Sequence, residues 1–280
     1  MSNSKKTIVV IDNDEMNIKN ITKLYMEYDI KSNSSFDINE AISYIEEQNP
    51  VLIFVNIGYG DRSAIALISA ISNYKAFIIT PLIALIDQLA NDFSTIEAEL
   101  FDKSGVWDLQ RTPVFREYIR AKTDSFLAIS EKMSTQNSTV NLPIVHWSLP
   151  RRVPNVFILD DESQQLEIFD DAVGKHFDIK YRKKIELAQD FLSNPEKTKP
   201  DLICIDIYID EEIGGFKFHN WIKAQKHLAE IPVVFTSSEW NGVRMAHCIK
   251  GGACDFIRKP FALSNASRLR WHLKISNYLQ

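Results

Sequence analysis

Short runs of apolar residues alternate along the chain with longer stretches in which apolar residues recur every three or four positions. The short runs favour buried strands, because a strand that is covered on both faces is apolar throughout, and the longer stretches favour amphipathic helices. Alternation of strand and helix is typical of a parallel sheet with helices on both faces. The pattern occurs once up to residue 133 and restarts at Val156.

The first half is expected to contain five strands and five helices. The strands are predicted at 7–11, 30–34, 51–56, 82–86 and 106–110, with 77–80 competing for the fourth. The first helix begins after Asp12–Glu15 and has its apolar face from Ile21 to Tyr28. The others are predicted at 38–47, 63–72, 88–103 and 113–133, and Pro113 suits the first turn of the last one.

The second half repeats this order. Strands are predicted from Val156 to the acids at 160–162, and at 179–181, 201–206, 231–235 and 255–258. Helices are predicted at 166–177, 185–192, 216–228, 242–250 and 263–279. The repeat of about 130 residues is far longer than a solenoid unit, so two copies of one fold are expected.

The segment between the copies, residues 134–154, is rich in Ser, Thr, Asn and Pro and is interpreted as a linker. Four apolar residues in it are expected to dock part of the linker: Leu142, Ile144, Val145 and Trp147. The predicted domains are therefore 1–133 and 155–280.

Composition narrows the function classes. The apolar fraction of 45% is sufficient for packed cores, while the net charge of −5 argues against a broad surface for nucleic acid or anionic membrane. The first residues lack the apolar core of a secretory signal, and the apolar segment 76–86 is far shorter than a membrane span. The three cysteines form no CxxC pair and are interpreted as reduced thiols, which indicates a cytoplasmic protein.

The candidate chemistry lies at strand ends in the second half. Asp206 ends the apolar run 201–206, Asp160 and Asp161 end the run from Val156, and Lys259 follows the last strand. The carboxyl ends of parallel strands line the ligand crevice of such a sheet. Three carboxylates and one lysine there predict an oxygen-lined Mg²⁺ pocket with a fixed positive charge beside it.

These residues, in this order, resemble the receiver domain of two-component response regulators (the CheY-like family) over roughly 154–280. The resemblance implies two flavodoxin-like (βα)5 domains in tandem, of α/β class. It implies Asp160 and Asp161 as the acid pair, Asp206 as phospho-acceptor and Lys259 as the family's lysine. It also implies Mg²⁺ as the cofactor, with the Tyr208 main-chain carbonyl as a further ligand, and no enzyme activity beyond the domain's own phosphotransfer and dephosphorylation.

Two further roles follow from the same resemblance. Ser237 matches the phosphoryl-binding hydroxyl residue, because it lies five residues after Pro232, although Thr236 competes for the role. Phe256 matches the aromatic switch position three residues before Lys259, with plain core packing as the alternative.

The first half resembles a receiver whose reactive groups have been lost. Asp12 remains, but the second acid, the acceptor, the hydroxyl residue and the lysine are replaced by Asn13, Asn56, Ile86 (or Leu85) and Thr112. This half is predicted neither to bind Mg²⁺ tightly nor to be phosphorylated, although Asp14 could partly restore a metal site. It is interpreted as a pseudo-receiver for docking or regulation, with a vestigial scaffold as the alternative.

The resemblance thus implies a bacterial, cytoplasmic signalling protein. Its partners would be a histidine kinase or histidine phosphotransfer protein and a downstream protein target, with no nucleic acid and no membrane. A homodimer through the face of helix four, strand five and helix five is possible by resemblance. Two other readings remain: a phosphorylation-independent adaptor, and the regulatory half of a longer output enzyme such as a cyclic-di-GMP synthase or phosphodiesterase.

Overall fold

The computed structural model describes residues 5–90, 92–136, 149, 152–194, 196, 198–210 and 213–279. The chain divides into two compact units, Met1–Trp147 and Ser148–Gln280. Residues 134–136 of the predicted linker belong to the last helix of the first unit. The four apolar residues expected to dock the linker lie outside the described residues.

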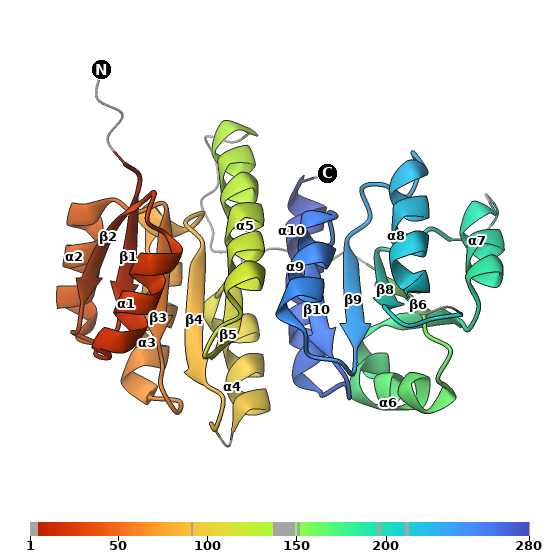
Figure 1. The fold of residues 1–280 in the computed structure, drawn as a ribbon, viewed down its shortest axis with the longest axis horizontal. Helices are drawn as coiled ribbons and strands as arrows, with labels where there is room; N and C mark the ends of the chain where they lie inside the picture. Colours follow the sequence, from red (N-terminus) through yellow and green to blue (C-terminus); the bar gives the residue numbers. More distant parts are fainter. Residues whose placement is uncertain are drawn as a thin grey trace. The chain divides into compact units, whose positions relative to one another are not determined.

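Each unit contains one five-stranded parallel sheet, and the two sheets have the same strand order (Figure 1). The first sheet has the order β2-β1-β3-β4-β5. Its strands are β1 (Thr7–Ile11), β2 (Asp29–Asn33), β3 (Leu52–Asn56), β4 (Leu82–Asp87) and β5 (Asp108–Thr112). The second sheet has the order β7-β6-β8-β9-β10. Its strands are β6 (Asn155–Leu159), β7 (Asp178–Arg182), β8 (Leu202–Asp206), β9 (Val233–Ser237) and β10 (Asp255–Arg258). The predicted tandem (βα)5 fold is confirmed.

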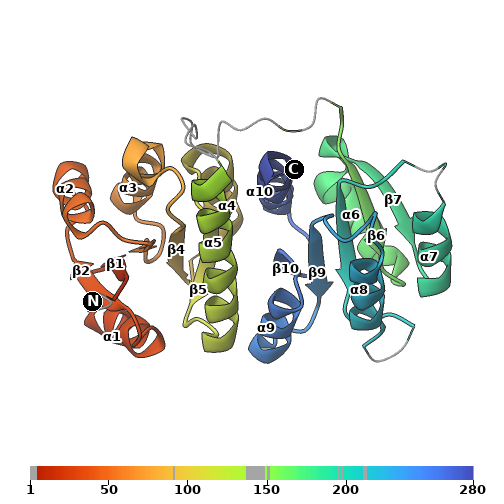
Figure 2. The same ribbon diagram turned by 90° about the horizontal axis from the view of Figure 1, so that it is seen from above.

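The helices cover both faces of each sheet (Figure 2). Those of the first unit are α1 (Glu15–Leu24), α2 (Ile38–Gln48), α3 (Arg62–Asn73), α4 (Phe93–Glu99) and α5 (Arg116–Gln136). Those of the second unit are α6 (Ser163–Val173), α7 (Ile185–Ser193), α8 (Gly214–Ala224), α9 (Gly242–Lys250) and α10 (Ser264–Leu279). No described helix is long and apolar enough to cross a membrane.

Alternate residues of the second sheet pack into two separate cores. Val156 and Ile158 of β6 belong to the cluster that also contains apolar residues of α6 and α10, such as Phe169 and Leu269. Between them, Phe157 points to the other face and stacks on Phe191 of α7 at a centroid distance of 5.5 Å. Because successive side chains of a strand point to opposite faces, a wholly apolar strand can fill both cores.

Several predicted boundaries were wrong. The helix predicted at 88–103 is shorter, because Asp87 accepts the Leu89 N–H and starts a turn, so that α4 begins only at Phe93. Its end continues as a π-helical turn, Leu100–Ser104, before Gly105 adopts a left-handed conformation. The last strand of the unit begins at Asp108 rather than at residue 106, and Val106 and Trp107 are buried just ahead of its pairing with β4.

Proline and glycine positions account for other differences. Helix α5 begins at Arg116, three residues after Pro113, so this proline does not occupy the first helical turn. Helix α8 begins earlier than predicted, at Gly214, and ends at Ala224 rather than at residue 228. Strand β9 occupies 233–237 rather than 231–235, which brings the Thr236 and Ser237 hydroxyls into the strand.

Candidate functional site

Two neighbouring strands place acidic residues at one edge of the second sheet. Strand β8 ends at Asp206, and β6, its hydrogen-bonded neighbour, ends one residue before Asp160. Leu159 pairs with Ile205, so the strands end at nearly the same level. The Asp160 N–H donates to Arg182 O of β7 at 3.1 Å, which fixes the backbone where the acids begin.

Lys259 joins these acids directly. Its Nζ lies 2.6 Å from Asp160 Oδ2 and 2.8 Å from Asp206 Oδ2, and all three side chains are buried. Asp161 is exposed, yet carboxylate oxygens of Asp160, Asp161 and Asp206 all lie within 4.8 Å of one another. The structure therefore brings the four predicted groups together at one point.

The geometry of the three acids fits a small divalent cation. Octahedral Mg²⁺ has oxygen ligands at about 2.0–2.1 Å, so ligand oxygens on opposite sides of the ion are roughly 4 Å apart. The observed separation of up to 4.8 Å needs only a small closure to match this. Asp160, Asp161 and Asp206 could hold the ion, which would supply charge neutralisation for phosphoryl oxygens. The Tyr208 carbonyl remains a predicted ligand.

Burial governs the electrostatics of the pocket. It raises the pKa of Asp206 to about 6, with further raising by Asp160 and Asp161, against the lowering effect of Lys259. Burial likewise raises the pKa of Asp160, against the hydrogen bond and charge of Lys259. For Lys259, burial lowers the pKa, but the two carboxylates outweigh it and the net shift is upward. The lysine therefore stays an ammonium and balances carboxylates that are costly to bury alone.

The hydroxyl and aromatic candidates lie around this pocket. Ser237 and Thr236 are both buried, so burial does not choose between them, but Ser237 Oγ accepts the Glu239 N–H at 3.1 Å. Phe256 is buried and meets Trp240 edge to face at a centroid distance of 5.9 Å. The Tyr208 N–H donates to Asp206 Oδ1 at 3.3 Å. The roles expected of these residues remain predictions.

The structure adds residues that sequence reasoning missed. The Tyr208 hydroxyl and the Arg244 guanidinium both bond to the Glu239 carboxylate, which links the loops that follow β8 and β9. The pattern of the sequence contains no signal for this link. For Gly215 the sequence did contain a signal, because a glycine stands there after β8. A Cβ atom built at this position would lie 2.1 Å from Asp206 O. Only glycine lets α8 approach the backbone of Asp206 so closely.

The corresponding place in the first unit has a different arrangement. Asp12 is fully buried, and its Oδ1 accepts from Asn56 Nδ2 at 2.9 Å and from the Asp14 N–H at 2.8 Å. The Asn56 amide thus donates to the acid, whereas the equivalent Asp206 shares a lysine with Asp160. The pKa of Asp12 is raised by burial.

The structure also places the other residues of the first unit that were predicted to stand in for reactive groups. Asn13 is exposed, Ile86 is buried, and Thr112 Oγ1 donates to Ile86 O at 3.3 Å. Asp14 caps α1 by accepting the Met16 N–H. Among the residues that the structure describes, the first unit has no group of three metal-ligating side chains comparable to that of the second.

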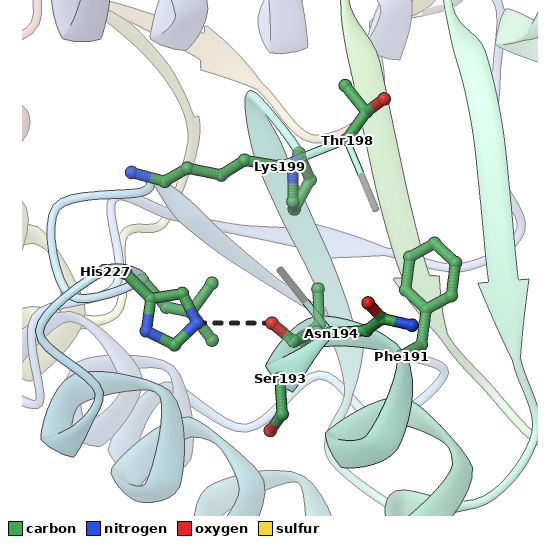
Figure 3. Close-up of a pocket in the computed structure, with 9 residues that line it drawn as sticks. Phe191, Ser193, Asn194, Thr198, Lys199 and His227 are labelled. Atoms are coloured by element: carbon green, nitrogen blue, oxygen red, sulfur yellow. Dashed lines mark hydrogen bonds between the residues drawn. The ribbon is translucent and has the colours of Figure 1, made fainter. Parts of the chain in front are cut away.

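A pocket of about 400 Å³ lies elsewhere in the second unit (Figure 3). It is lined by the end of α7, by residues 198–200 before β8, and by His227 and Leu228 before β9. His227 Nε2 lies 3.2 Å from Leu192 O. Because this pocket is formed by segments that precede the strands, it lies at the opposite edge of the sheet from Asp206 and is not part of the acidic site.

The fold and the site define a class: a doubly wound α/β domain with an acidic, lysine-containing pocket at the carboxyl ends of its strands. The second unit contains a segment, residues 156–269, that matches the response regulator receiver domain family.

Named relatives are also response regulators. The chain is 32% identical over 128 residues to the two-component response regulator ORR1 of rice, covering 43% of this chain and 55% of ORR1. It is 35% identical over 89 residues to the two-component response regulator ARR17 of Arabidopsis thaliana, covering 29% and 58%. The chain thus spans about half the length of these relatives. They come from plants, so the expected bacterial source stays a prediction.

The chain also resembles solved structures of response regulators. The phosphorylated cyanobacterial phytochrome response regulator RcpA matches 44% of this chain and 92% of its own, with 19% identity and a TM-score of 0.37. The Mn²⁺-bound response regulator Rcp1 matches 45% and 95%, with 16% identity and a TM-score of 0.35.

Proposed function

We propose that the second unit accepts a phosphoryl group on Asp206 from a phosphohistidine of a histidine kinase or histidine phosphotransfer protein. The observation that supports this most is the convergence of Asp206 with Asp160, Asp161 and Lys259 at one strand edge. A buried carboxylate of this kind needs a cation or a reaction to compensate its burial, and this pocket has groups for both.

The transfer needs a nucleophile and a way to spread charge. An Asp206 carboxylate oxygen attacks phosphorus, the bond from phosphorus to the donor's imidazole nitrogen breaks, and an acyl phosphate forms. Lys259 donates to the transferred oxygens, and the Ser237 hydroxyl (or that of Thr236) donates to another. Asp160, Asp161 and Asp206 would hold Mg²⁺, which would supply the remaining charge neutralisation.

We also propose how phosphorylation changes the protein's surface through these contacts. Phosphorylation adds negative charge and acceptor oxygens, which draw the hydroxyl residue of β9 inward. Phe256 then turns and reshapes the surface of α9, β10 and α10, where a downstream protein or a second copy binds. The first unit serves docking or regulation, because its Asn56 amide is not a nucleophile and is already bonded to Asp12.

The test is to incubate the chain with Mg²⁺ and acetyl phosphate and to locate the label by peptide mass spectrometry. We expect label on Asp206 in the wild type and none in Asp206→Asn. Asp190→Asn, which makes the same change at an exposed position of α7, should label normally. Absence of label at every donor concentration would favour the phosphorylation-independent adaptor.

A further inference from the structure

The edge strands of the two sheets begin alike and then diverge. β2 starts with Asp29-Ile30-Lys31 and β7 with Asp178-Ile179-Lys180, and each pairs in the same register with its neighbour, Thr7 with Asp29 and Asn155 with Asp178. The next four residues are Ser32-Asn33-Ser34-Ser35 in the first unit and Tyr181-Arg182-Lys183-Lys184 in the second. Three uncharged positions of the first unit are therefore basic in the second.

This basic segment lies beside the acidic pocket. Arg182 O accepts the N–H of Asp160, the first acid of the site, just as Asn33 O accepts that of Asp12. The Lys183 ammonium lies 2.5 Å from the Oγ atom of Ser163, the first residue of α6, which follows Asp161 by two positions. Lys183 and Lys184 are exposed. We call residues 182–184 the basic rim.

Much of the positive charge of the basic rim is not paired with a nearby carboxylate among the described residues. The Asp178 carboxylate pairs with Lys180 at 2.6 Å rather than with the basic rim. Asp210 Oδ2 accepts the Ile185 N–H at 2.7 Å. Among the described residues, no carboxylate lies within ion-pair distance of Lys183 or Lys184. Arg182 lies over the Phe191 ring at 4.4 Å, which holds its guanidinium on the unit's surface.

We propose that the basic rim docks the phosphohistidine-bearing protein through an acidic surface of that partner. This inference rests on the proposed function of Asp206. The phosphoryl group and the acceptor pocket are both anionic, so an approaching donor is repelled unless neighbouring charges attract it. The rim is present in the unit that retains the acceptor and absent at the same register in the unit that lost it.

The experiment compares two kinds of donor. The protein donor is a phosphorylated histidine phosphotransfer domain, chosen from a purified panel as the one that phosphorylates the wild-type chain fastest. The small donor is acetyl phosphate, which makes no protein contact. The variant is Lys183→Ser/Lys184→Ser, which installs the residues that the first unit has at the same positions. Lys226→Glu, an exposed residue before β9, is the matched surface control.

We expect kcat/KM with the protein donor to fall roughly tenfold in the double variant and to lose most of its dependence on salt, because steered association is weakened by ionic strength. With acetyl phosphate the rate should change by less than about twofold, since a small donor relies on the pocket. The Lys226 variant should behave like the wild type with both donors.

Other results overturn the proposal. An unchanged rate with the protein donor, or a panel in which no domain transfers faster than acetyl phosphate, removes the docking role. An equal loss with both donors places the effect in the pocket instead. If the double variant transfers normally but loses binding to anionic lipid vesicles or to single-stranded DNA, the rim serves that other surface. Failure of acetyl phosphate to label Asp206 refutes the proposed function itself, independently of the rim.

Discussion

At the scale of single residues, the two units neutralise a buried acid in different ways. In the second unit the Lys259 ammonium lies between Asp160 and Asp206. In the first unit the neutral amide of Asn56 donates to Asp12, and Asp12 Oδ2 has no partner among the described residues. Asp12 thus accepts one side-chain hydrogen bond, from Asn56, and one from the Asp14 N–H, where the second unit has two ion pairs.

Placing a carboxylate at position 56 should therefore destabilise the first unit. Asn56→Asp replaces a donor to Asp12 by a second carboxylate, with no lysine to share. We expect a loss of roughly 2–4 kcal/mol in the free energy of unfolding at pH 7, shrinking as the pH falls and the pair binds a proton. Urea unfolding at several pH values measures this loss of unfolding free energy. Asn33→Asp is the control, because only the side-chain oxygen of Asn33 is used, by the Ser35 N–H. Equal losses in both variants would contradict the argument.

A second residue-scale prediction concerns pH. Burial alone would lower the pKa of His272, but Cys254 and the Asp255 carboxylate, 2.7 Å from Nε2, raise it to about 9. Because the folded value exceeds the unfolded value of about 6.5, the stabilisation is complete below pH 6.5 and is lost as the pH rises through 9. It amounts to at most roughly 3 kcal/mol.

The measurement is urea unfolding of wild type and His272→Gln between pH 6 and 10. The difference in unfolding free energy between the two proteins should be largest at pH 6 and should decline towards pH 10. A difference that grows with pH would contradict the assigned direction. Comparing the two proteins at each pH cancels the titration of tyrosines and lysines elsewhere.

The sequence predicted the convergence of Asp160, Asp206 and Lys259, because strands of a parallel sheet end at the same edge and each residue ends or directly follows a strand. It could not predict the Asn56–Asp12 hydrogen bond, since that depends on side-chain orientation. Nor could it choose between Ser237 and Thr236, which are adjacent, both hydroxylic and both buried.

At the scale of elements, prediction succeeded where local signals were strong. The range of α9 was predicted correctly, because Asn241 caps it by accepting two N–H groups and Gly251 follows its end. The range predicted for α4 was wrong, because its polar sequence fits helix and turn equally well and the hydrogen bonds of Asp87 decide between them. Tertiary contacts, absent from the local pattern, set such boundaries.

Helix α8 gives an element-scale prediction. A Cβ at Gly215 would lie 2.1 Å from Asp206 O and 2.9 Å from Ile207 Cα, both backbone atoms, so Gly215→Ala must displace α8 or the end of β8. We expect a loss of about 2–4 kcal/mol in stability and slower labelling of Asp206. At Gly251 the nearest atom is at 3.3 Å, so Gly251→Ala should change stability by under about 1 kcal/mol. Thermal unfolding measures the stability of the two variants, and the acetyl phosphate assay measures their rate of labelling. Equal effects of Gly215→Ala and Gly251→Ala would contradict the steric argument.

At the scale of the whole chain, one fold occurs twice with unequal chemistry. The repeat was predictable because the order of apolar runs is the same in both halves and each run became a strand of the same sheet order. The linker prediction falls largely on residues 137–148, outside the described part. Because the site around Asp12 and Asn56 occupies the same place in the fold as the site around Asp160 and Asp206, the first unit can serve as an internal control in experiments on the second.

Magnesium should therefore act on one unit only. A ligand that binds the folded state alone stabilises it by RT ln(1 + [L]/Kd), or about 2.7 kcal/mol at a hundredfold excess over Kd. Hydrogen exchange followed by mass spectrometry should show slower exchange with Mg²⁺ in the segments after β6, β8 and β9. The equivalent segments of the first unit, 12–15 and 56–61, should not change. In Asp206→Asn the protection should weaken strongly, because one of three carboxylate ligands becomes a neutral amide. Equal protection of both units would mean that Asp12 with Asn56 suffices for a metal site, and the distinction drawn between the two pockets would then be wrong.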